Sequence, residues 1–445
     1  MQSSWKLKQP KQLCSSSTSK TSNKRGRPAQ WDVIKGGDSK NVSRSFNVYN
    51  PPNLCSTFGV GETTAASVPL RIILAFHGYG GKPAQEIRKW QDVADDLNAI
   101  IIAPLGTETI ETQKLGWNAV ECCGDPVLNE IDDLDFILYG VMEIFLNQFG
   151  GRRGISIGSN DNSDDKNNKQ VHVIATGFSN GGFFTSLLGI LDDRPEWLVG
   201  IVPTGGYQYD IDAYSSTPEL AVFMHHGGRD SVVNPNGCCI ANDEPKQVKR
   251  GSKSNCMFDI GVKQETCQSA QSVYLLWSTI NGCSSDHNDS RSIKEGGVKS
   301  VESECFVGKD CIEPTNFCVW TNEGHSWGGT FPGIEMMRPW MEDVFVRAEK
   351  RRFEQRDADE LIKPHHRTRV GKSIFLTASS ILLGFIALSA AYCYSKRWHF
   401  MRSSGKRKSS EDEDLQVFRE EEMTVMCRED EIEKHSVSVP YTLGL

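Results

Sequence analysis

The chain has 445 residues, a mass of 49.6 kDa and a formal net charge of −8 at pH 7. With 38% hydrophobic and 24% charged residues it can bury a sizeable core, which excludes a wholly disordered protein. The acidic balance argues against nucleic acid as a partner, because proteins that bind nucleic acid need a basic face for the phosphates.

Residues 1–45 are rich in Ser, Lys, Asn and Gly, and no apolar stretch that could act as a secretory signal peptide follows Met1. We therefore expect a disordered N-terminal tail over residues 1–45. From residue 46 to residue 355 the composition is that of a large globular domain.

Short apolar runs alternate with segments of helical spacing along this domain. The run Leu70–Phe76 ends in the glycine loop 77–81 and predicts a buried strand. Further strands are predicted at residues 99–103, 171–175, 199–202, 220–224 and 317–320, and helices at 84–97, 130–149, 268–280 and 335–353. This alternation predicts an α/β fold with a mainly parallel sheet covered by helices on both faces. Residues 150–169 look like a polar surface insertion, and residues 231–266 and 284–316 like long loops pinned by cysteines.

Eleven of the fourteen cysteines lie between Cys55 and Cys318, including the vicinal pairs at 122–123 and 238–239. No CxxC pair with a matching second half suggests zinc, so we expect no metal. We expect disulfides rather than scattered free thiols, and with them an oxidising compartment. Connectivity stays open.

Residues 374–394 contain no charged side chain, and a helix of that length spans roughly 30 Å, the thickness of the bilayer hydrocarbon. The sequence therefore predicts one C-terminal transmembrane helix there, after a charged linker at 356–373 and before an acidic disordered tail at 395–445. Slightly more Lys and Arg follow the span than precede it, which favours a cytosolic tail and an extracellular or lumenal globular domain. The sequence names no cytosolic partner for the tail.

Residues 177–181 fit the pattern G-x-S-x-G, with a predicted strand before them and a helix pattern after them. A serine on such a sharp turn is lifted above the sheet, so Ser179 is the candidate nucleophile. The backbone N–H of Asn180, at the start of the helix, would face an oxyanion formed at the target of Ser179.

A serine nucleophile needs a histidine base and an acid that orients it, which in this topology follow in the order acid, histidine. Asp230 follows the predicted strand 220–224 and is the candidate acid, with Asp210 and Asp212 as rivals. His325 follows the last predicted strand and is the candidate base. Weaker alternatives for the base are His225, His226 and His287.

A second oxyanion donor should come from the loop after an early strand, because its glycines let backbone N–H groups approach the substrate. In the loop 77–81 the Tyr79 N–H is the first choice and the Gly80 N–H the second. Three aromatic residues on nearby loops could line a substrate pocket or belong to the core: Trp117, Tyr207 and Trp327.

Seven ordered motifs give these patterns a family likeness: H-G-Y-G-G at 77–81, G-W-N-A-V-E-C-C at 116–123, I-D-D-L-D-F-I at 131–137, A-T-G-F-S-N-G-G at 175–182, H-G-G-R-D at 226–230, W-S-T-I-N-G-C at 277–283 and G-H-S-W at 324–327. Over residues 45–350 the chain resembles the α/β-hydrolase family of polyhydroxybutyrate depolymerases and feruloyl or acetylxylan esterases. The resemblance implies an α/β-hydrolase fold, Ser179, Asp230 and His325 as nucleophile, acid and base, and no cofactor.

The resemblance makes feruloyl or acetyl esters of polysaccharide the first expected substrate, and a polyhydroxyalkanoate the second. A peptidase on the same fold, or a catalytically inactive hydrolase domain used as a surface receptor, are the alternatives. The transmembrane helix and the loops 231–266 and 284–316 match nothing in the family pattern.

Overall fold

The computed structural model divides the chain into two units, Met1–Asp357 and Ala358–Leu445. It describes residues 5–9, 28–36, 42–54, 69–108, 113–120, 122, 125–150, 171–208, 211–237, 268–284, 291–294, 302–325 and 333–362. The second unit is described only at 358–362, so the expected membrane helix 374–394 and the acidic tail lie outside these ranges. Within the described ranges, no helix is both long and apolar enough to cross a bilayer.

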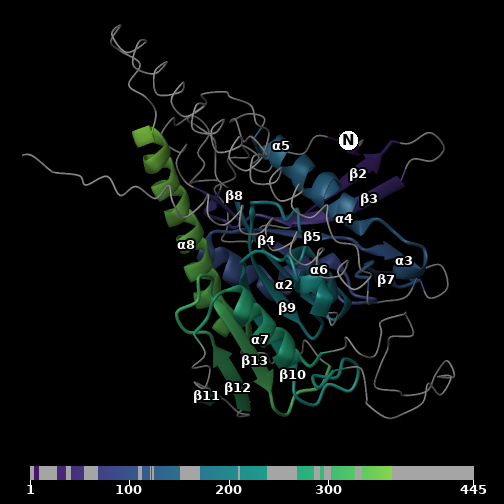
Figure 1. Cartoon of the computed structure of the whole chain (residues 1–445). Helices are drawn as coiled ribbons and strands as arrows, with labels where there is room; N and C mark the ends of the chain where they lie inside the picture. The colour runs from purple at the N-terminus through teal and green to yellow at the C-terminus, as the bar shows by residue number, and fades with distance from the viewer. Residues whose placement is uncertain are drawn as a thin grey trace, which may run out of the picture. The chain divides into compact units, whose positions relative to one another are not determined.

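One large sheet forms the centre of the first unit (Figure 1), and in the described residues it has eleven strands in the order β1-β2-β3-β5-β4-β8-β9-β10-β13-β12-β11. Six neighbouring strands, from β5 to β13, run parallel, and the strands outside them pair antiparallel. The strands are β1 (Trp5–Leu7), β2 (Ala29–Lys35), β3 (Val42–Tyr49), β4 (Leu70–Phe76), β5 (Ile100–Pro104), β8 (Val171–Phe178), β9 (Leu198–Thr204), β10 (Ala221–Gly227), β11 (Arg291–Lys294), β12 (Glu302–Val307) and β13 (Thr315–Trp320); β6 (Thr107–Glu108) and β7 (Leu115–Gly116) form a separate ribbon.

Helices cover both faces of this sheet. Along β4, Ile72 and Leu74 belong to one core cluster and Ile73 and Ala75 to the other, because successive side chains point to opposite faces. The first cluster packs against η2 (Phe136–Glu143, π-helical), α5 (Ile144–Gly150), α6 (Asn180–Gly189) and α7 (Ala270–Ile280), and the second against α2 (Pro83–Leu97) and α8 (Gly333–Ile362). Shorter helical turns are α3 (Asp125–Leu128), α4 (Asp133–Asp135) and η3 (Ile211–Tyr214). This large, mostly parallel sheet with helices on both sides is consistent with the expected α/β-hydrolase fold.

The expected disordered tail over residues 1–45 is wrong where the structure describes it. β1 and β2 extend the sheet antiparallel to β3, and Trp5 and Trp31 are buried at 7% and 1% exposure. The Trp5 indole N–H donates to Asp135 at 2.6 Å. The prediction relied on a polar average composition, and it missed the alternation in 29–35 that turns Trp31 and Val33 inward. The domain therefore begins before residue 46, and α8 continues to Ile362, past the expected end at 355.

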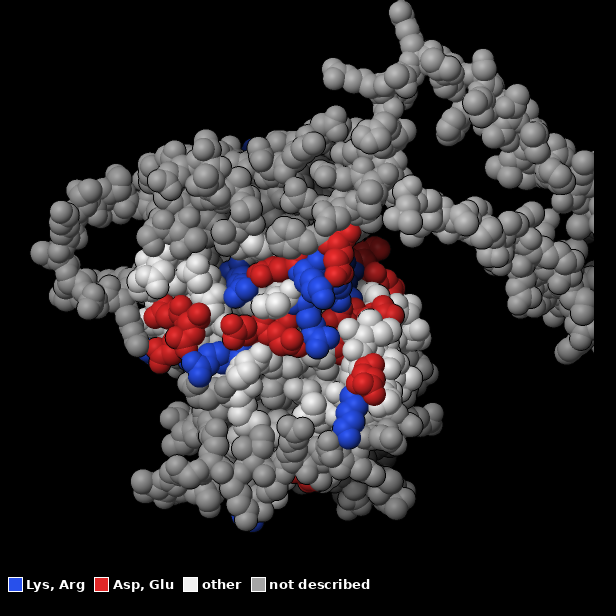
Figure 2. All heavy atoms as spheres, turned by 90° about the vertical axis from the view of Figure 1, so that its left-hand side faces the viewer, with Lys and Arg blue, Asp and Glu red and all other residues white. Residues whose placement is uncertain are grey.

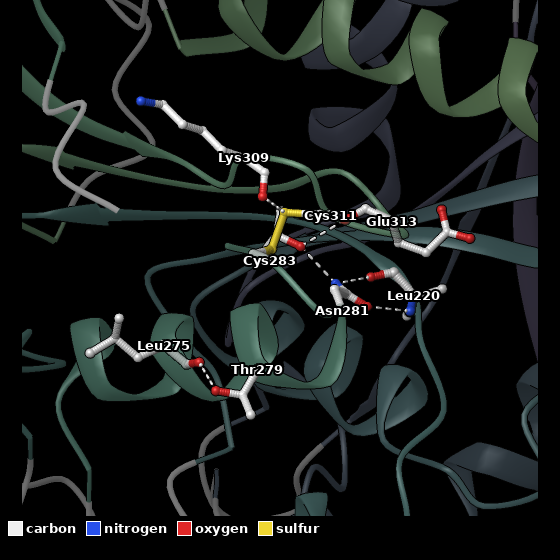
Figure 3. The surroundings of a disulfide bond; sticks show 9 residues. Leu220, Leu275, Thr279, Asn281, Cys283, Lys309, Cys311 and Glu313 are labelled. Carbon is white, nitrogen blue, oxygen red and sulfur yellow. Dashed lines mark hydrogen bonds between the residues drawn. A yellow bond between two sulfur atoms is a disulfide. The ribbon is translucent and has the colours of Figure 1, made fainter. Parts of the chain in front are cut away.

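The second expected loop, 284–316, is also wrong in part, because β11 and β12 continue the sheet beyond β13. Disulfides do form, as expected. Cys305 and Cys318 are directly opposed on β12 and β13 and bonded, and Cys122 is disulfide-bonded too. Cys283–Cys311 joins the residues after α7 to the connection between β12 and β13, beside Asn281, whose side chain bonds both backbone groups of Leu220 (Figure 3). These bonds hold together the segment that leads into β13.

Helix α8 lies on the side of the molecule that Figure 2 faces, where acidic and basic side chains are interspersed. Ion pairs connect α8 to its neighbours: Arg71 of β4 binds Glu349 at 2.8 Å, and Arg338 binds Asp96 of α2. The Arg71–Glu349 pair is part-buried, whereas the Arg338–Asp96 pair is exposed, and exposed pairs contribute little to stability. The buried residues of α8, such as Met341 and Phe345, carry its attachment to the sheet.

Candidate active site

Ser179 stands at the turn between β8 and α6, where a parallel strand ends and a helix begins. Its φ of 55° and ψ of −122° are a conformation that a residue with a Cβ rarely adopts. Gly177 and Gly181 permit this turn, because a Cβ on Gly177 would overlap the carbonyl of Gly181, and one on Gly181 would overlap the carbonyl of Phe76. The local sequence therefore forces the hydroxyl of Ser179 to the carboxyl-terminal edge of the sheet.

Asp230 follows β10 in a short turn and is buried, with 5% exposure. Its Oδ1 accepts the backbone N–H groups of Val232 and Val233, both at 2.8 Å. These two bonds fix the carboxylate, so that its other oxygen, Oδ2, faces the loop after the neighbouring strand β13.

His325 lies in that loop, and its imidazole connects the other two residues. Its Nδ1 is 2.7 Å from Oδ2 of Asp230, and its Nε2 is 2.9 Å from Oγ of Ser179. Because a carboxylate only accepts, the Nδ1 carries the proton, and the Nε2 can accept the hydroxyl proton of Ser179. The ring of Phe178 packs against the His325 ring, with the ring centroids 4.8 Å apart. Three residues predicted from separate loops thus form one hydrogen-bonded chain.

The electrostatics of Asp230 favour its charged form. Burial by itself raises the pKa of this carboxyl, but the hydrogen bond and charge of His325, with the Val233 N–H, outweigh burial and lower the pKa below its ordinary value. Asp230 is therefore an anion at neutral pH, as required of a group that orients a histidine and stabilises its positive charge.

The expected oxyanion donors have different outcomes. The Asn180 N–H lies at the first position of α6, where the helix itself offers no acceptor for it. The Asn180 side chain faces away and bonds the N–H and carbonyl of Trp117, which holds the 115–122 loop. Gly78 of the glycine loop packs against Ser179, since a Cβ there would lie 3.4 Å from the Ser179 Cβ. The backbone N–H of Gly80 already donates to the carbonyl of Leu115 at 2.7 Å, so the prediction of Gly80 as an oxyanion donor is wrong. The Tyr79 N–H as an oxyanion donor stays a prediction.

The aromatic pocket residues are not supported as predicted. Trp117 is fully buried, its indole N–H donates to the carbonyl of His77, and its ring stacks on Phe184, so it is a core residue. Tyr207 has 1% exposure and packs edge-on against His226 at 5.4 Å. Both side chains point inward, a direction that sequence position does not reveal. Trp327 lies outside the described residues.

Two buried histidines lie beside the site: the sequence assigned no role to His77, and it named His226 only as a weaker alternative for the base. His77 accepts the Gly106 N–H at Nε2 and bonds the Gly78 carbonyl through Nδ1; burial lowers its pKa to about 4, so it is neutral. His226 lies 3.5 Å from Asp230. His287, a rival base, and Asp210, a rival acid, lie outside the described residues. The sequence signal for His77 and His226 was their position, because His77 directly follows β4 and His226 is the penultimate residue of β10.

Among the described residues, no cluster of three or more His, Cys, Asp or Glu side chains has an arrangement suited to a metal ion.

No protein-family model matches the chain, and no curated protein matches it. Solved structures similar to it include an acetyl xylan esterase from Aspergillus awamori (13% identity, TM-score 0.35, covering 67% of this chain and 93% of that one). Two others are the S-formylglutathione hydrolase from Agrobacterium tumefaciens (10% identity, TM-score 0.35, 73% and 95%) and esterase PE8 (13%, TM-score 0.31, 63% and 95%). Identities and TM-scores this low say nothing about what this chain acts on.

Proposed function

We propose that the protein is a serine carboxylic-ester hydrolase that works through an acyl-enzyme. The observation that carries the proposal is the continuous hydrogen-bonded chain from Oγ of Ser179 through both ring nitrogens of His325 to Oδ2 of Asp230. Its members come from the ends of three strands of one parallel sheet, and a hydroxyl gains nucleophilic reactivity only when a base and an orienting acid are aligned in this way.

In the proposed mechanism, His325 Nε2 takes the proton of Ser179 as Oγ attacks the ester carbonyl carbon. The resulting oxyanion accepts hydrogen bonds from the backbone N–H of Asn180 and, by expectation, of Tyr79. The imidazolium gives its proton to the alcohol oxygen, and the C–O bond breaks. Water then attacks the acyl-enzyme with the same base, which releases the acid and restores Ser179.

For the substrate we propose feruloyl or acetyl esters of polysaccharide, and as the alternative a polyhydroxyalkanoate. Both come from the family resemblance that the seven ordered motifs carry. In the first class the ester is a side group of the polymer, and in the second it links the units of the polymer chain. A panel on the full-length protein would compare feruloylated xylan, acetylated xylan and polyhydroxybutyrate. Faster hydrolysis of either xylan supports the first assignment, and faster hydrolysis of polyhydroxybutyrate replaces it.

Labelling with a fluorophosphonate probe tests the enzyme itself against the inactive-receptor alternative. The full-length wild type, made in an oxidising compartment, should form an adduct that Ser179→Ala abolishes. An unlabelled wild type, or equal labelling of Ser179→Ala, would remove the enzyme proposal. Comparing aryl-ester and peptide substrates decides the remaining alternative: better turnover of peptides would make it a peptidase.

The membrane anchor is part of the same proposal, supported by the uncharged run 374–394 and its basic flanks. The full-length protein should stay in the membrane pellet after alkaline carbonate extraction, and deletion of 374–394 should move it to the supernatant. Wild-type protein in the supernatant would contradict the anchor while leaving the enzyme proposal intact.

A further inference from the structure

A second imidazole, that of His226, contacts the turn that carries the acid of the proposed site. His226 lies on β10, four residues before Asp230, and is fully buried. Its Nε2 is 2.8 Å from the carbonyl oxygen of Val233, the residue whose own N–H donates to Oδ1 of Asp230. The same Nε2 lies 3.5 Å from Oδ2 of Asp230, the oxygen that binds His325.

The partners of His226 fix its protonation. A carbonyl oxygen only accepts, so the Nε2 of His226 must carry a hydrogen. Burial is the main cause that lowers the pKa of His226, so the ring is neutral and its Nδ1 bears no proton. Among the described residues, this Nδ1 has no hydrogen-bond partner. The ring is therefore a permanent donor at one nitrogen only, on the side that faces Asp230.

An imidazole at this position is costly as a core residue. A buried nitrogen without a partner destabilises a protein, a cost that an apolar ring of similar size would avoid. The neighbouring His225 points to the other side of β10, toward Trp320 with ring centroids 5.3 Å apart. His225 and His226 are therefore two adjacent buried imidazoles that can be compared by mutation. His226 contacts Asp230 and its turn, whereas His225 packs against Trp320.

We propose that His226 is a positioning residue for Asp230, an inference that rests on the proposed function. Its Nε2–H holds the carbonyl of Val233 and so fixes the turn 230–233, in which two N–H groups hold Oδ1 of Asp230. Oδ2 then remains aimed at Nδ1 of His325, and the His226 N–H adds a positive dipole beside it. Without this donor the turn can rotate, and Asp230 loses its alignment with His325.

The inference predicts a pattern that a merely structural residue would not produce. His226→Phe keeps the ring and removes the donor. A misalignment of about 1 Å can lower turnover by about 10²-fold, so kcat should fall by about that factor with KM unchanged. The acidic limb of the kcat/KM profile should also move to lower pH, because an imidazole without an aligned carboxylate is protonated less readily. His226→Gln, whose amide N–H can reach the Val233 carbonyl, should return both values toward wild type.

His225→Phe is the control, because it removes the adjacent buried imidazole without touching Asp230. It should change the melting temperature but leave the acidic limb at its wild-type pH. Among the described residues, the titratable groups around His226 are Asp230, His325, His225 and Tyr207, and all remain present in His226→Phe. If the acidic limb of the kcat/KM profile moves in His226→Phe but not in His225→Phe, the shift is therefore attributable to the lost N–H donor of His226.

The inference is overturned if the acidic limb of His226→Phe stays at the wild-type pH, whatever happens to kcat or to the melting temperature. It is overturned equally if His225→Phe moves the limb by the same amount. Should His226→Phe not fold, His226→Asn, which is too short to hold the Val233 carbonyl, is judged by the same two criteria. If Ser179→Ala abolishes probe labelling but the His226 criteria are not met, only the inference about His226 is rejected. If Ser179→Ala is labelled like wild type, the proposed function is rejected, and the inference about His226 with it.

Discussion

Oδ2 of Asp230 lies 2.7 Å from Nδ1 of His325, although 95 residues separate them in the chain. The contact exists because β10 and β13 are parallel neighbours, with Gly227 paired to Trp320, so the loops that follow both strands leave the sheet at the same place. An acid and a base on two such loops meet because their strands are neighbours in the sheet, and not because of the sequence next to either residue.

Replacing the candidate nucleophile should abolish turnover without unfolding the protein. We expect Ser179→Ala to lower kcat toward aryl esters by about 10⁶-fold, because removal of the attacking oxygen leaves only binding and oxyanion stabilisation. Steady-state kinetics and thermal melting would measure the two effects. Ser216→Ala, which removes an exposed hydroxyl bonded to Asp192, should leave kcat unchanged. A residual rate within tenfold of wild type would exclude Ser179 as the nucleophile.

Neutralising the acid should also lower turnover. Asp230→Asn presents an amide to Nδ1 of His325 and favours the wrong tautomer, for which a loss of about 10⁴-fold in kcat is expected. The matched control is Asp343→Asn, which breaks an exposed ion pair with Arg347 on α8 and should have no effect on kcat. If both variants retain wild-type kcat, Asp230 does not orient the base.

Acid should destabilise the fold through its buried histidines. Burial lowers the pKa of His77 from 6.5 to about 4, so between these values the unfolded chain binds a proton that the folded chain does not. The contribution of His77 is thus fully present above pH 6.5 and is lost as the pH falls through about 4, by a total of about 3 kcal/mol. Urea unfolding at several pH values measures this slope, and His77→Gln should flatten it. An identical slope in His77→Gln would refute this origin.

The disulfide between Cys305 and Cys318 should stabilise the strands that lead to His325. It closes a loop of 13 residues, for which chain entropy predicts about 3 kcal/mol. The double variant Cys305→Ser, Cys318→Ser should therefore unfold at lower urea concentration than wild type. Chemical reduction of wild type should lower the midpoint further, because Cys283–Cys311 is lost too. A double variant as stable as wild type would contradict a stabilising role.

Removing residues 1–45 should damage the core, contrary to what a disordered tail would allow. The deletion takes away β1, β2 and the buried rings of Trp5 and Trp31, and removal of one large core side chain alone typically costs about 3–5 kcal/mol. Expression yield and thermal melting of the truncated chain would test this. Deletion of 10–27 alone, which spares the described part of both strands, is the control. Equal melting of the 1–45 deletion and the full chain would argue against these strands.

The central strands and the candidate site were predictable from the sequence for a common reason. A parallel strand buried on both faces is a short apolar run, as in Leu70–Phe76, and the residues that follow such runs gather at one edge of the sheet. That rule, together with the G-x-S-x-G pattern and the chain order serine, acid, histidine, singled out Ser179, Asp230 and His325 from the sequence. The glycines at 177 and 181 had a local reason as well, because the turn around Ser179 leaves no space for their side chains.

Tertiary structure alone decided the edges of the sheet and the surroundings of the triad. The strands β1, β2 and β12 contain many polar residues, and such segments become strands because a neighbour offers them hydrogen bonds and a face to bury. The same holds for Trp117, which the fold buries in the core, and for His226, because the turn after β10 brings the Val233 carbonyl and Asp230 to its ring. Local sequence determines which segments can be strands and turns, whereas the free energy that selects a side chain's partners comes from residues far away in the chain.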